Sequence, residues 1–206
     1  MHQKRQETTT KLPIKRKGTT YVARASSHLN DSVPVVIALR DMLKLARTAK
    51  EVQEMIKLSL LKINGRKVKD YRESIKLFNI LEADKSYQLT LSPTGKFIFE
   101  ESKLKDSHLC KVINKKIQNS RLIQLNFHDG SNVISKEKIK VGDSVHIDFS
   151  GKITKHISLE KGKEALIISG KYIGKRGKID SVEGKSVSIN INGGQTSLKE
   201  VQVIVL

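Results

Sequence analysis

The chain has 206 residues, with 39 Lys and Arg against 21 Asp and Glu, which gives a net charge of +18. Charges are almost never buried unpaired, so this excess lies on the surface and favours a polyanionic partner. Nucleic acid is favoured over an anionic membrane, because no basic amphipathic helix or lipid anchor is visible. A single cysteine, Cys110, excludes an internal disulfide and a multi-cysteine zinc site and fits a reducing cytosol.

Residues 1–32 are predicted to form a basic N-terminal arm. The segment shows little hydrophobic periodicity, and no apolar run of signal-peptide or membrane-spanning length follows it. We expect it to be irregular in free solution and to order along phosphates. Its candidate phosphate-binding residues are Lys4, Arg5, Lys15, Arg16 and Lys17.

Residues 33–79 are predicted to form a small helical module. A first helix is expected from Val35 to Ala46, with apolar residues at helical spacing along one stripe. Arg40 and Lys44, four residues apart, are predicted to share a second, basic face. Arg47 and Lys50 extend this basic character toward the next helix.

A second helix is predicted from the capping-box pattern of Thr48 and Glu51. Its apolar residues Val52, Met55 and Ile56 recur at helical spacing and should face inward. The module is therefore expected to contain two short helices in succession.

A hairpin is predicted after the second helix, because Asn64-Gly65 supplies the two positive-φ positions of a tight turn. A two-residue loop places Lys62 opposite Lys67, and Leu61 opposite Val68 on the other face. Directly opposed like charges are unfavourable on a hairpin, and an anion would relieve that repulsion, as solvent and salt also could. Lys62, Arg66, Lys67 and Lys69 are therefore further candidate phosphate contacts.

From Ile80 onward the sequence predicts almost only short strands with frequent turns, which is typical of small barrels. We expect a central β domain at 80–157 and a C-terminal barrel at 158–206. Apolar residues alternate along the predicted strands, including Leu122–Phe127, Val187–Ile191 and a last strand in which Val201, Val203 and Val205 share a face.

The segment Glu164–Val182 combines an apolar strand with three glycines, Gly170, Gly174 and Gly177, spaced among basic residues. It does not match a nucleotide-binding loop, since no Gly-Lys-Ser/Thr follows and no helix pattern begins at its end. Glycine lets the backbone approach a partner closely. A backbone-reading loop is therefore expected, with candidate contacts at Lys171, Lys175, Arg176 and Lys178.

The sequence gives no sign of catalysis, metal or cofactor. His108 lies two residues before Cys110, but two ligands do not make a metal site, and Cys110 is expected to fill a core. Asp143, His146 and Asp148 are close in sequence, yet they are expected to be surface or hairpin residues. We therefore predict no enzyme, no metal site, no cofactor and no small-molecule substrate.

Four segments in order resemble a known family. They are the helical module from Arg40 to Arg72, the stretches His108–Val112 and Leu125–Gly130, and the glycine-spaced segment Ser169–Ile179, which looks like a KOW motif. Together they resemble the archaeal and eukaryotic small-subunit ribosomal protein family S4e, and because the chain ends at Leu206 the archaeal type is favoured.

This resemblance implies an α+β, mostly β protein with a helical RNA-binding module, a central β domain and a KOW-type SH3-like barrel. It implies a structural constituent of the small ribosomal subunit, in the cytoplasm and in one copy per ribosome, that binds ribosomal RNA through phosphate and shape contacts and touches neighbouring ribosomal proteins. The candidate phosphate contacts named above then become candidate RNA-binding residues. The alternative is a KOW-containing ribosome-assembly or transcription elongation factor.

Overall fold

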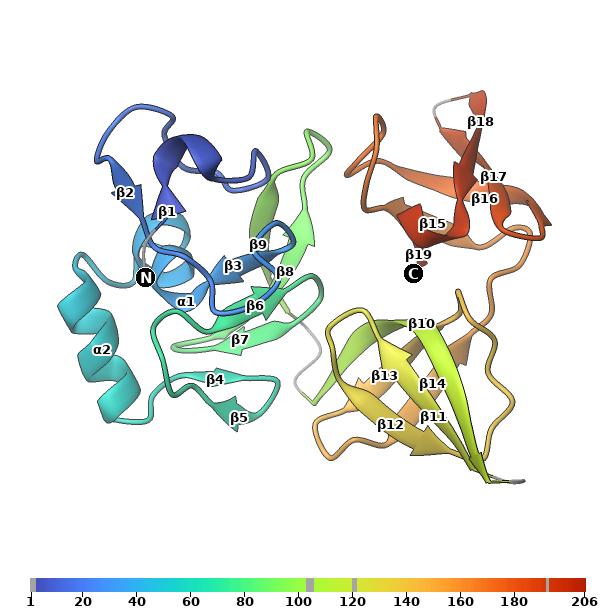
Figure 1. The fold of residues 1–206 in the computed structure, drawn as a ribbon, viewed down its shortest axis with the longest axis horizontal. Coiled ribbons are helices and arrows are strands. Elements are labelled where there is room, and N and C mark those ends of the chain that lie inside the picture. The colour runs from blue at the N-terminus through green and yellow to red at the C-terminus, as the bar shows by residue number, and fades with distance from the viewer. Residues whose placement is uncertain (1–2, 103–105, 120–121, 192) are drawn as a thin grey trace. The chain divides into compact units, whose positions relative to one another are not determined.

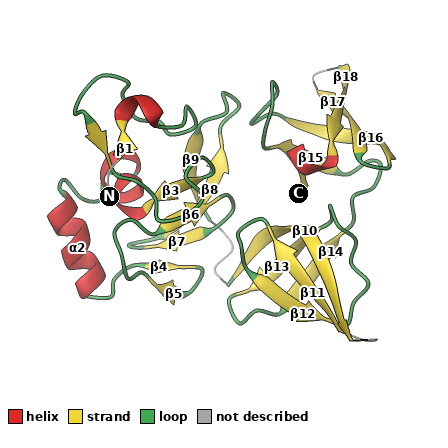
Figure 2. Cartoon of the chain, in the orientation of Figure 1, coloured by secondary structure: helices red, strands yellow, loops and turns green. Residues whose placement is uncertain are grey.

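The computed structural model describes residues 3–102, 106–119, 122–191 and 193–206. It divides the chain into two compact units, residues 1–92 with 96–106 and residues 93–95 with 107–206. Short strands dominate both units, and helix is confined to brief segments (Figure 2). The protein is therefore α+β and mostly β, as predicted. The finer division of the sequence at residues 32, 79 and 157 stays a prediction.

The first unit contains the two predicted helices and three small sheets (Figure 1). In chain order its elements are β1 (Gln3–Lys4), η1 (Arg5–Glu7), β2 (Tyr21–Val22), β3 (Ser32–Pro34), α1 (Val35–Ile37), η2 (Ala38–Met42), α2 (Ala49–Lys57), β4 (Lys62–Ile63), β5 (Arg66–Lys67), β6 (Ser74–Lys76), β7 (Ile80–Glu82), β8 (Ser86–Leu91) and β9 (Phe97–Glu101). The sheets have the strand orders β1-β2, β3-β6 and β5-β4-β7-β8-β9.

The first helix is shorter than predicted. The α-helical turn α1 continues as the π-helical segment η2, in which the Leu43 amide donates to the Ala38 carbonyl at 2.8 Å. Lys44 then adopts a φ of 59°, a left-handed conformation that ends the helix. The prediction that Arg40 and Lys44 share a helical face is therefore wrong, because only Arg40 is helical.

The second helix and the hairpin confirm the local sequence signals. Thr48 caps α2 by accepting a hydrogen bond from the Glu51 amide at 3.3 Å, and Val52 is fully buried. Asn64 and Gly65 both have positive φ, and β4 pairs with β5 so that Lys62 lies opposite Lys67. Strong local turn and cap chemistry thus fixes these two elements.

The N-terminal segment carries local structure that its sequence did not suggest. Strand β1 pairs with β2, and Leu12 and Ala25 are buried. The Phe97 amide of β9 donates to the Lys11 carbonyl at 2.8 Å, which ties this segment to a distant strand. Residues 1 and 2 of the predicted arm lie outside the described residues.

The second unit consists of two five-stranded antiparallel sheets. Its elements are β10 (Ser107–Asn119), β11 (Leu122–Phe127), β12 (Asn132–Ser135), β13 (Ser144–Asp148), β14 (Ile153–Ile157), β15 (Glu164–Ile167), β16 (Arg176–Glu183), β17 (Ser186–Ile191), β18 (Gly194–Lys199), η3 (Glu200–Gln202) and β19 (Val203–Val205). The strand orders are β12-β11-β10-β13-β14 and β18-β17-β16-β15-β19.

Each sheet of the second unit has an apolar core. The first packs Cys110, Val112, Leu125, Phe127 and Val145 with Ile139 and Ile147, so the expectation that Cys110 fills a core is confirmed. In the second, Val187, Ile189 and Ile191 are buried on one face of β17, as their alternation predicts. Val201, by contrast, is 73% exposed in η3, because a 3-10 turn interrupts the predicted alternation before β19.

Among the described residues, no helix has the length and apolar character required to cross a membrane.

Candidate nucleic-acid interface

The candidate cations of the helical module fall into two groups in the structure. Arg40, Lys62 and Arg66 already have acidic partners: Asp41 at 2.7 Å, Glu82 at 3.8 Å and Glu73, respectively. The Arg40 guanidinium donates two hydrogen bonds to the Asp41 carboxylate, and these bonds raise the pKa of Arg40 above its usual value. Four further candidate lysines of the module are exposed and make no ion pair within the described ranges; they are Lys44, Lys50, Lys67 and Lys69.

The opposed lysines of the hairpin have an internal partner that the sequence did not reveal. Strand β4 pairs with β7 on its other side, which places Glu82 directly opposite Lys62. The Lys62 ammonium lies 3.8 Å from the Glu82 carboxylate, while Lys67 remains exposed. The like-charge repulsion is therefore partly relieved within the protein, and Lys67 is the member of the pair that is available to an anion.

Arg47 and Glu51 organise the start of α2. The Arg47 amide donates to the Glu51 carboxylate at 2.7 Å, and this hydrogen bond, with a further one from Thr48, lowers the pKa of Glu51. The Arg47 side chain is exposed. A negative side chain in the first turn also suits the helix dipole, so the carboxylate serves the helix rather than an external ligand.

Arg5 has a structural role that the sequence did not predict. Its guanidinium donates to the Thr19 carbonyl at 2.7 Å, to the Thr19 hydroxyl at 2.8 Å and to the Lys15 carbonyl at 2.5 Å. These bonds close the loop that carries Lys15, Arg16 and Lys17, all of which are exposed. Arg5 thus presents three neighbouring cations on a shaped loop, and Lys4 is exposed next to it.

The glycine-spaced segment forms a tight connection between β15 and β16. Gly170 and Gly174 have φ angles of 91° and 82°, which favour glycine. The Gly174 amide donates to the Ile167 carbonyl at 2.8 Å and closes the turn. The four candidate cations, Lys171, Lys175, Arg176 and Lys178, lie on this turn and on the start of β16.

An aromatic ring orients two of these cations. The ammonium groups of Lys171 and Lys175 lie 5.8 and 5.5 Å from the centre of the Tyr172 ring, within the range of a cation–π interaction. Gly177 differs from the sequence expectation, because its close approach is to a neighbouring strand: an added Cβ would overlap the Asn190 carbonyl oxygen. This glycine therefore serves packing within the sheet.

Asp143 differs from the expectation of the sequence analysis, whereas His146 is half-buried on β13, in the hairpin that β13 forms with β14. Asp143 is buried, not a surface residue, and its carboxylate accepts from the Lys140 and Leu159 amides at 3.0 and 2.9 Å and contacts His156 Nε2 at 2.7 Å. Burial is the main cause that lowers the pKa of His146. The carboxylate organises loops around β13 and β14, which a sequence pattern could not reveal because its partners lie in separate segments.

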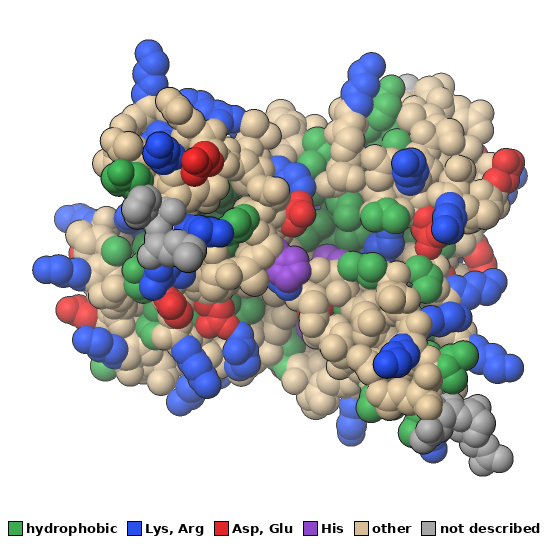
Figure 3. Space-filling model, in the orientation of Figure 1, with side chains coloured by type: hydrophobic (Ala, Val, Ile, Leu, Met, Phe, Trp, Pro, Cys, Tyr) green, Lys and Arg blue, Asp and Glu red, His purple; other side chains and the backbone are tan. Residues whose placement is uncertain are grey.

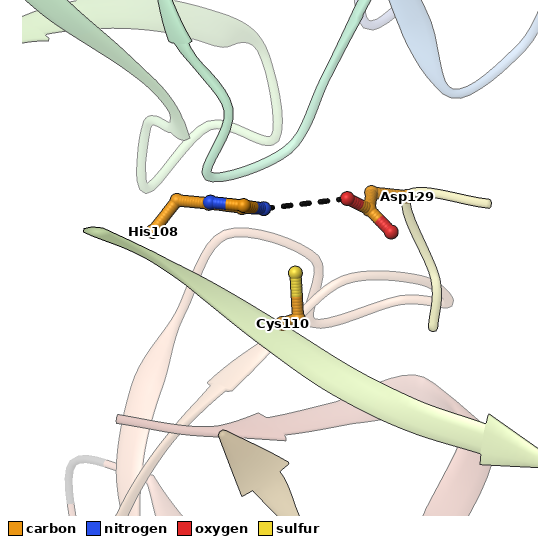
Figure 4. A group of neighbouring side chains, drawn as sticks. All are labelled: His108, Cys110 and Asp129. Carbon is orange, nitrogen blue, oxygen red and sulfur yellow. Dashed lines mark hydrogen bonds and ion pairs between the residues drawn. The ribbon is translucent and has the colours of Figure 1, made fainter. Parts of the chain in front are cut away.

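The sequence did not reveal that three polar side chains form a buried cluster. Asp129 joins His108 and Cys110, and the three side chains converge in Figure 4. His108 Nε2 lies 3.4 Å from Asp129 Oδ2. Burial raises the pKa of the Cys110 thiol; burial disfavours charge on Asp129 too, but hydrogen bonds from His108 and Ser131 hold the pKa of that carboxyl well below its usual range.

Lys111 is a buried cation in the second unit. Only 4% of the residue is exposed, and its ammonium donates to the carbonyls of Glu200 and, at 2.7 Å, Val203. Burial lowers the pKa of Lys111 to about 8. This lysine fastens β10 to the η3–β19 segment and is not accessible to a phosphate.

Lys and Arg side chains are spread over the visible face of both units and do not form one continuous patch (Figure 3). A surface of this kind can meet a polyanion at several separate places, with each cation group bound to a different stretch of backbone.

Comparisons with known proteins identify relatives of this chain. The model of ribosomal family S4e matches residues 83–154. A protein of Methanococcus maripaludis named small ribosomal subunit protein eS4 is 32% identical to this chain, in a match that covers 92% of this chain and 84% of that protein. The protein of the same name from Archaeoglobus fulgidus is 29% identical, with 88% and 80% covered.

A solved structure has a similar fold. The crystal structure of the 30S ribosomal protein S4e from Thermoplasma acidophilum has a TM-score of 0.74 and 27% sequence identity to this chain, and the match covers 86% of this chain and 95% of the other. Sequence and structure therefore agree over most of the chain, which belongs to the S4e family of ribosomal proteins.

Proposed function

We propose that this protein is a structural constituent of the small ribosomal subunit that binds ribosomal RNA through phosphate and shape contacts. The observation that carries the proposal is family membership, since relatives matched over most of their length are named small ribosomal subunit proteins. The net charge of +18 supports the same partner, because a surface this basic needs a polyanion. The protein would act in the cytoplasm, in one copy per ribosome, beside other ribosomal proteins.

Recognition would rely on the backbone of folded RNA. Double-stranded RNA offers proteins a shallow minor groove and a dense track of phosphates, so cations on shaped loops are suitable donors. The protein has three such groups: the loop closed by Arg5, the helix and hairpin of the helical module, and the turn around Tyr172. The last belongs to the β15–β19 sheet, which we propose is the KOW-type SH3-like barrel of the family, supported by its five short antiparallel strands.

Within the helical module, substitution of the hairpin lysines tests the proposed RNA contact most directly. Lys67 and Lys69 are exposed and make no ion pair among the described residues, so their removal should not disturb the fold. If roughly ten phosphates are neutralised in all, the logarithm of the affinity should fall with the logarithm of salt with a slope of roughly −7 to −9. The double variant Lys67→Ala, Lys69→Ala should reduce that slope by about 1 for each lysine.

A matched control is available in the second unit. Lys136 and Lys138 have the same spacing, are exposed and are outside the candidate groups, so Lys136→Ala with Lys138→Ala removes the same charge elsewhere. Filter binding to small-subunit ribosomal RNA over a salt series measures both variants. Equal losses in the two variants would show that only total charge matters and would remove the hairpin from the proposed interface.

Association with the ribosome is tested by sedimentation. A structural ribosomal protein should remain on mature small subunits after a high-salt wash, at one copy per subunit by quantitative mass spectrometry. A protein that is substoichiometric or leaves in the wash would favour the alternative of an assembly or transcription factor and would overturn the structural role.

A further inference from the structure

The cluster of His108, Cys110 and Asp129 is assembled by the register of two strands. Val112 of β10 pairs with Phe127 of β11, so the residues two positions earlier and two positions later, Cys110 and Asp129, come together at the end of the ladder. His108 lies two residues before Cys110 on the same strand and therefore on the same side of it. Three different metal-ligating side chains thus meet from two separate segments (Figure 4).

The cluster is compact and buried. One ligand atom from each residue lies within 4.8 Å of the other two. Cys110 is fully buried, and the side chains of His108 and Asp129 are only 7% and 5% exposed. A buried carboxylate needs compensating partners, and the His108 ring and the Ser131 amide and hydroxyl face Asp129.

The distance between His108 and Asp129 suits a shared ion. Hydrogen bonds between charged groups are usually about 2.7–2.9 Å long, whereas Nε2 and Oδ2 are 3.4 Å apart. Two ligands bound to zinc at about 2.0–2.2 Å with a tetrahedral angle lie about 3.4 Å from each other. The two atoms are therefore spaced as neighbouring ligands of a tetrahedral ion.

The carboxylate is also oriented for this role. Asp129 Oδ1 accepts hydrogen bonds from the amide and the hydroxyl of Ser131, at 2.8 and 2.6 Å. These bonds hold the carboxylate so that Oδ2 faces His108. Hydrogen bonds of this kind commonly fix the orientation of metal ligands.

We propose that His108, Cys110 and Asp129 bind one Zn²⁺ ion, with water in the fourth position. The donor set of one thiolate sulfur, one imidazole nitrogen and one carboxylate oxygen matches zinc and disfavours Mg²⁺ and Ca²⁺, which take oxygen ligands. The ion would join the start of β10 to the turn after β11 and stabilise the second unit. This site is independent of the proposed RNA contacts, none of which it includes.

The test uses Co²⁺ as a spectroscopic substitute for Zn²⁺. Because the cluster is buried, the full-length chain is unfolded in denaturant with chelator and reductant and then refolded with Co²⁺. We expect one equivalent of Co²⁺ per chain, a thiolate-to-cobalt charge-transfer band, tetrahedral ligand-field bands, and displacement of the cobalt by Zn²⁺. Refolding with Zn²⁺ should also raise the Tm above that of protein refolded with chelator.

Three variants locate the ion. Cys110→Ala should abolish the charge-transfer band, and Asp129→Asn should weaken binding by at least about ten-fold. If Asp129→Asn does not refold, as judged by circular dichroism in chelator, His108→Gln replaces it. The control is His28→Asn, which changes an exposed histidine in the first unit.

Two outcomes would overturn the proposal. A refolded wild-type chain without the charge-transfer band would show that His108 and Asp129 form only a buried ion pair. Unchanged cobalt stoichiometry and spectrum in Cys110→Ala would place the metal elsewhere on the chain. A band that is lost in Cys110→Ala and retained in His28→Asn supports the assignment.

Discussion

Gly177 provides a sharp test of how the C-terminal sheet is packed. An added Cβ would overlap the Asn190 carbonyl oxygen and lie 2.7 Å from Ile189 Cγ2, whereas real Cβ atoms essentially never come within 3.0 Å of another heavy atom. The strand cannot easily move away, because β16 is hydrogen-bonded to β15 on one side and to β17 on the other. Gly177→Ala therefore forces a displacement of β17 or a break in the ladder.

The expected cost follows from overpacking a close-packed interior, which is typically about 1–3 kcal/mol. For a chain of this length each kcal/mol lowers the Tm by roughly 2–4 °C, so a cost of ~2 kcal/mol predicts a fall of about 4–8 °C. The control is Gly194→Ala in the same sheet, where the nearest atom is the Ile191 carbonyl oxygen at 3.6 Å, an ordinary contact. Thermal unfolding by circular dichroism compares the two variants with the wild type.

The two substitutions should have clearly different effects on the Tm. Gly194→Ala is expected to change stability by no more than about 1 kcal/mol, with the sign favouring the variant because alanine restricts the unfolded chain. If Gly177→Ala has the Tm of the wild type, the argument that β17 leaves no room for a side chain at position 177 is refuted. That result would favour the expectation from the sequence, in which Gly177 lets the backbone approach an external partner.

Two further predictions concern stability. Burial lowers the pKa of Lys111 from 10.5 to about 8, so between these pH values the unfolded chain holds a proton that the folded chain has lost. The free energy of unfolding should therefore rise with pH across this window, by up to ~3 kcal/mol. In urea unfolding at a series of pH values, Lys111→Met should show no such rise. An equal rise in the variant would refute the assignment of this pH dependence to Lys111. Thr48→Ala should lower the free energy of unfolding by about 1 kcal/mol, measured in urea, because the α2 cap is lost. The control Thr20→Ala, at an exposed position, should have almost no effect. Equal losses of stability in the two variants would contradict a capping role for Thr48.

The features that the sequence predicted well are those set by neighbouring residues. The Asn64-Gly65 turn determines both the hairpin and its Lys62–Lys67 register, and Thr48 determines the start of α2. Strand β11 has the predicted bounds, Leu122–Phe127, because a stretch of alternating apolar residues is followed at once by a turn. In each case the decisive chemistry spans only a few positions of the chain.

The features that escaped prediction depend on contacts between distant segments. The end of the first helix is an exception: the left-handed conformation of Lys44 ends it, although the apolar stripe in the sequence continues. Glu82 reaches Lys62 only after β4 and β7 pair, and Asp129 reaches Cys110 only after β10 and β11 pair. The candidate interface was thus predicted as a set of cations, but which of them already hold internal partners could not be read from spacing.

The guanidinium of Arg5 has a consequence for the kinetics and strength of binding. A loop of three cations in a flexible tail would have to be ordered when it meets its partner, and that lost conformational freedom would be subtracted from the affinity. Here three hydrogen bonds from Arg5 to Thr19 and Lys15 order the loop before any encounter. The segment that looked least structured in the sequence is thus ordered locally, so under the proposed function this loop would lose little conformational freedom on binding a phosphate backbone.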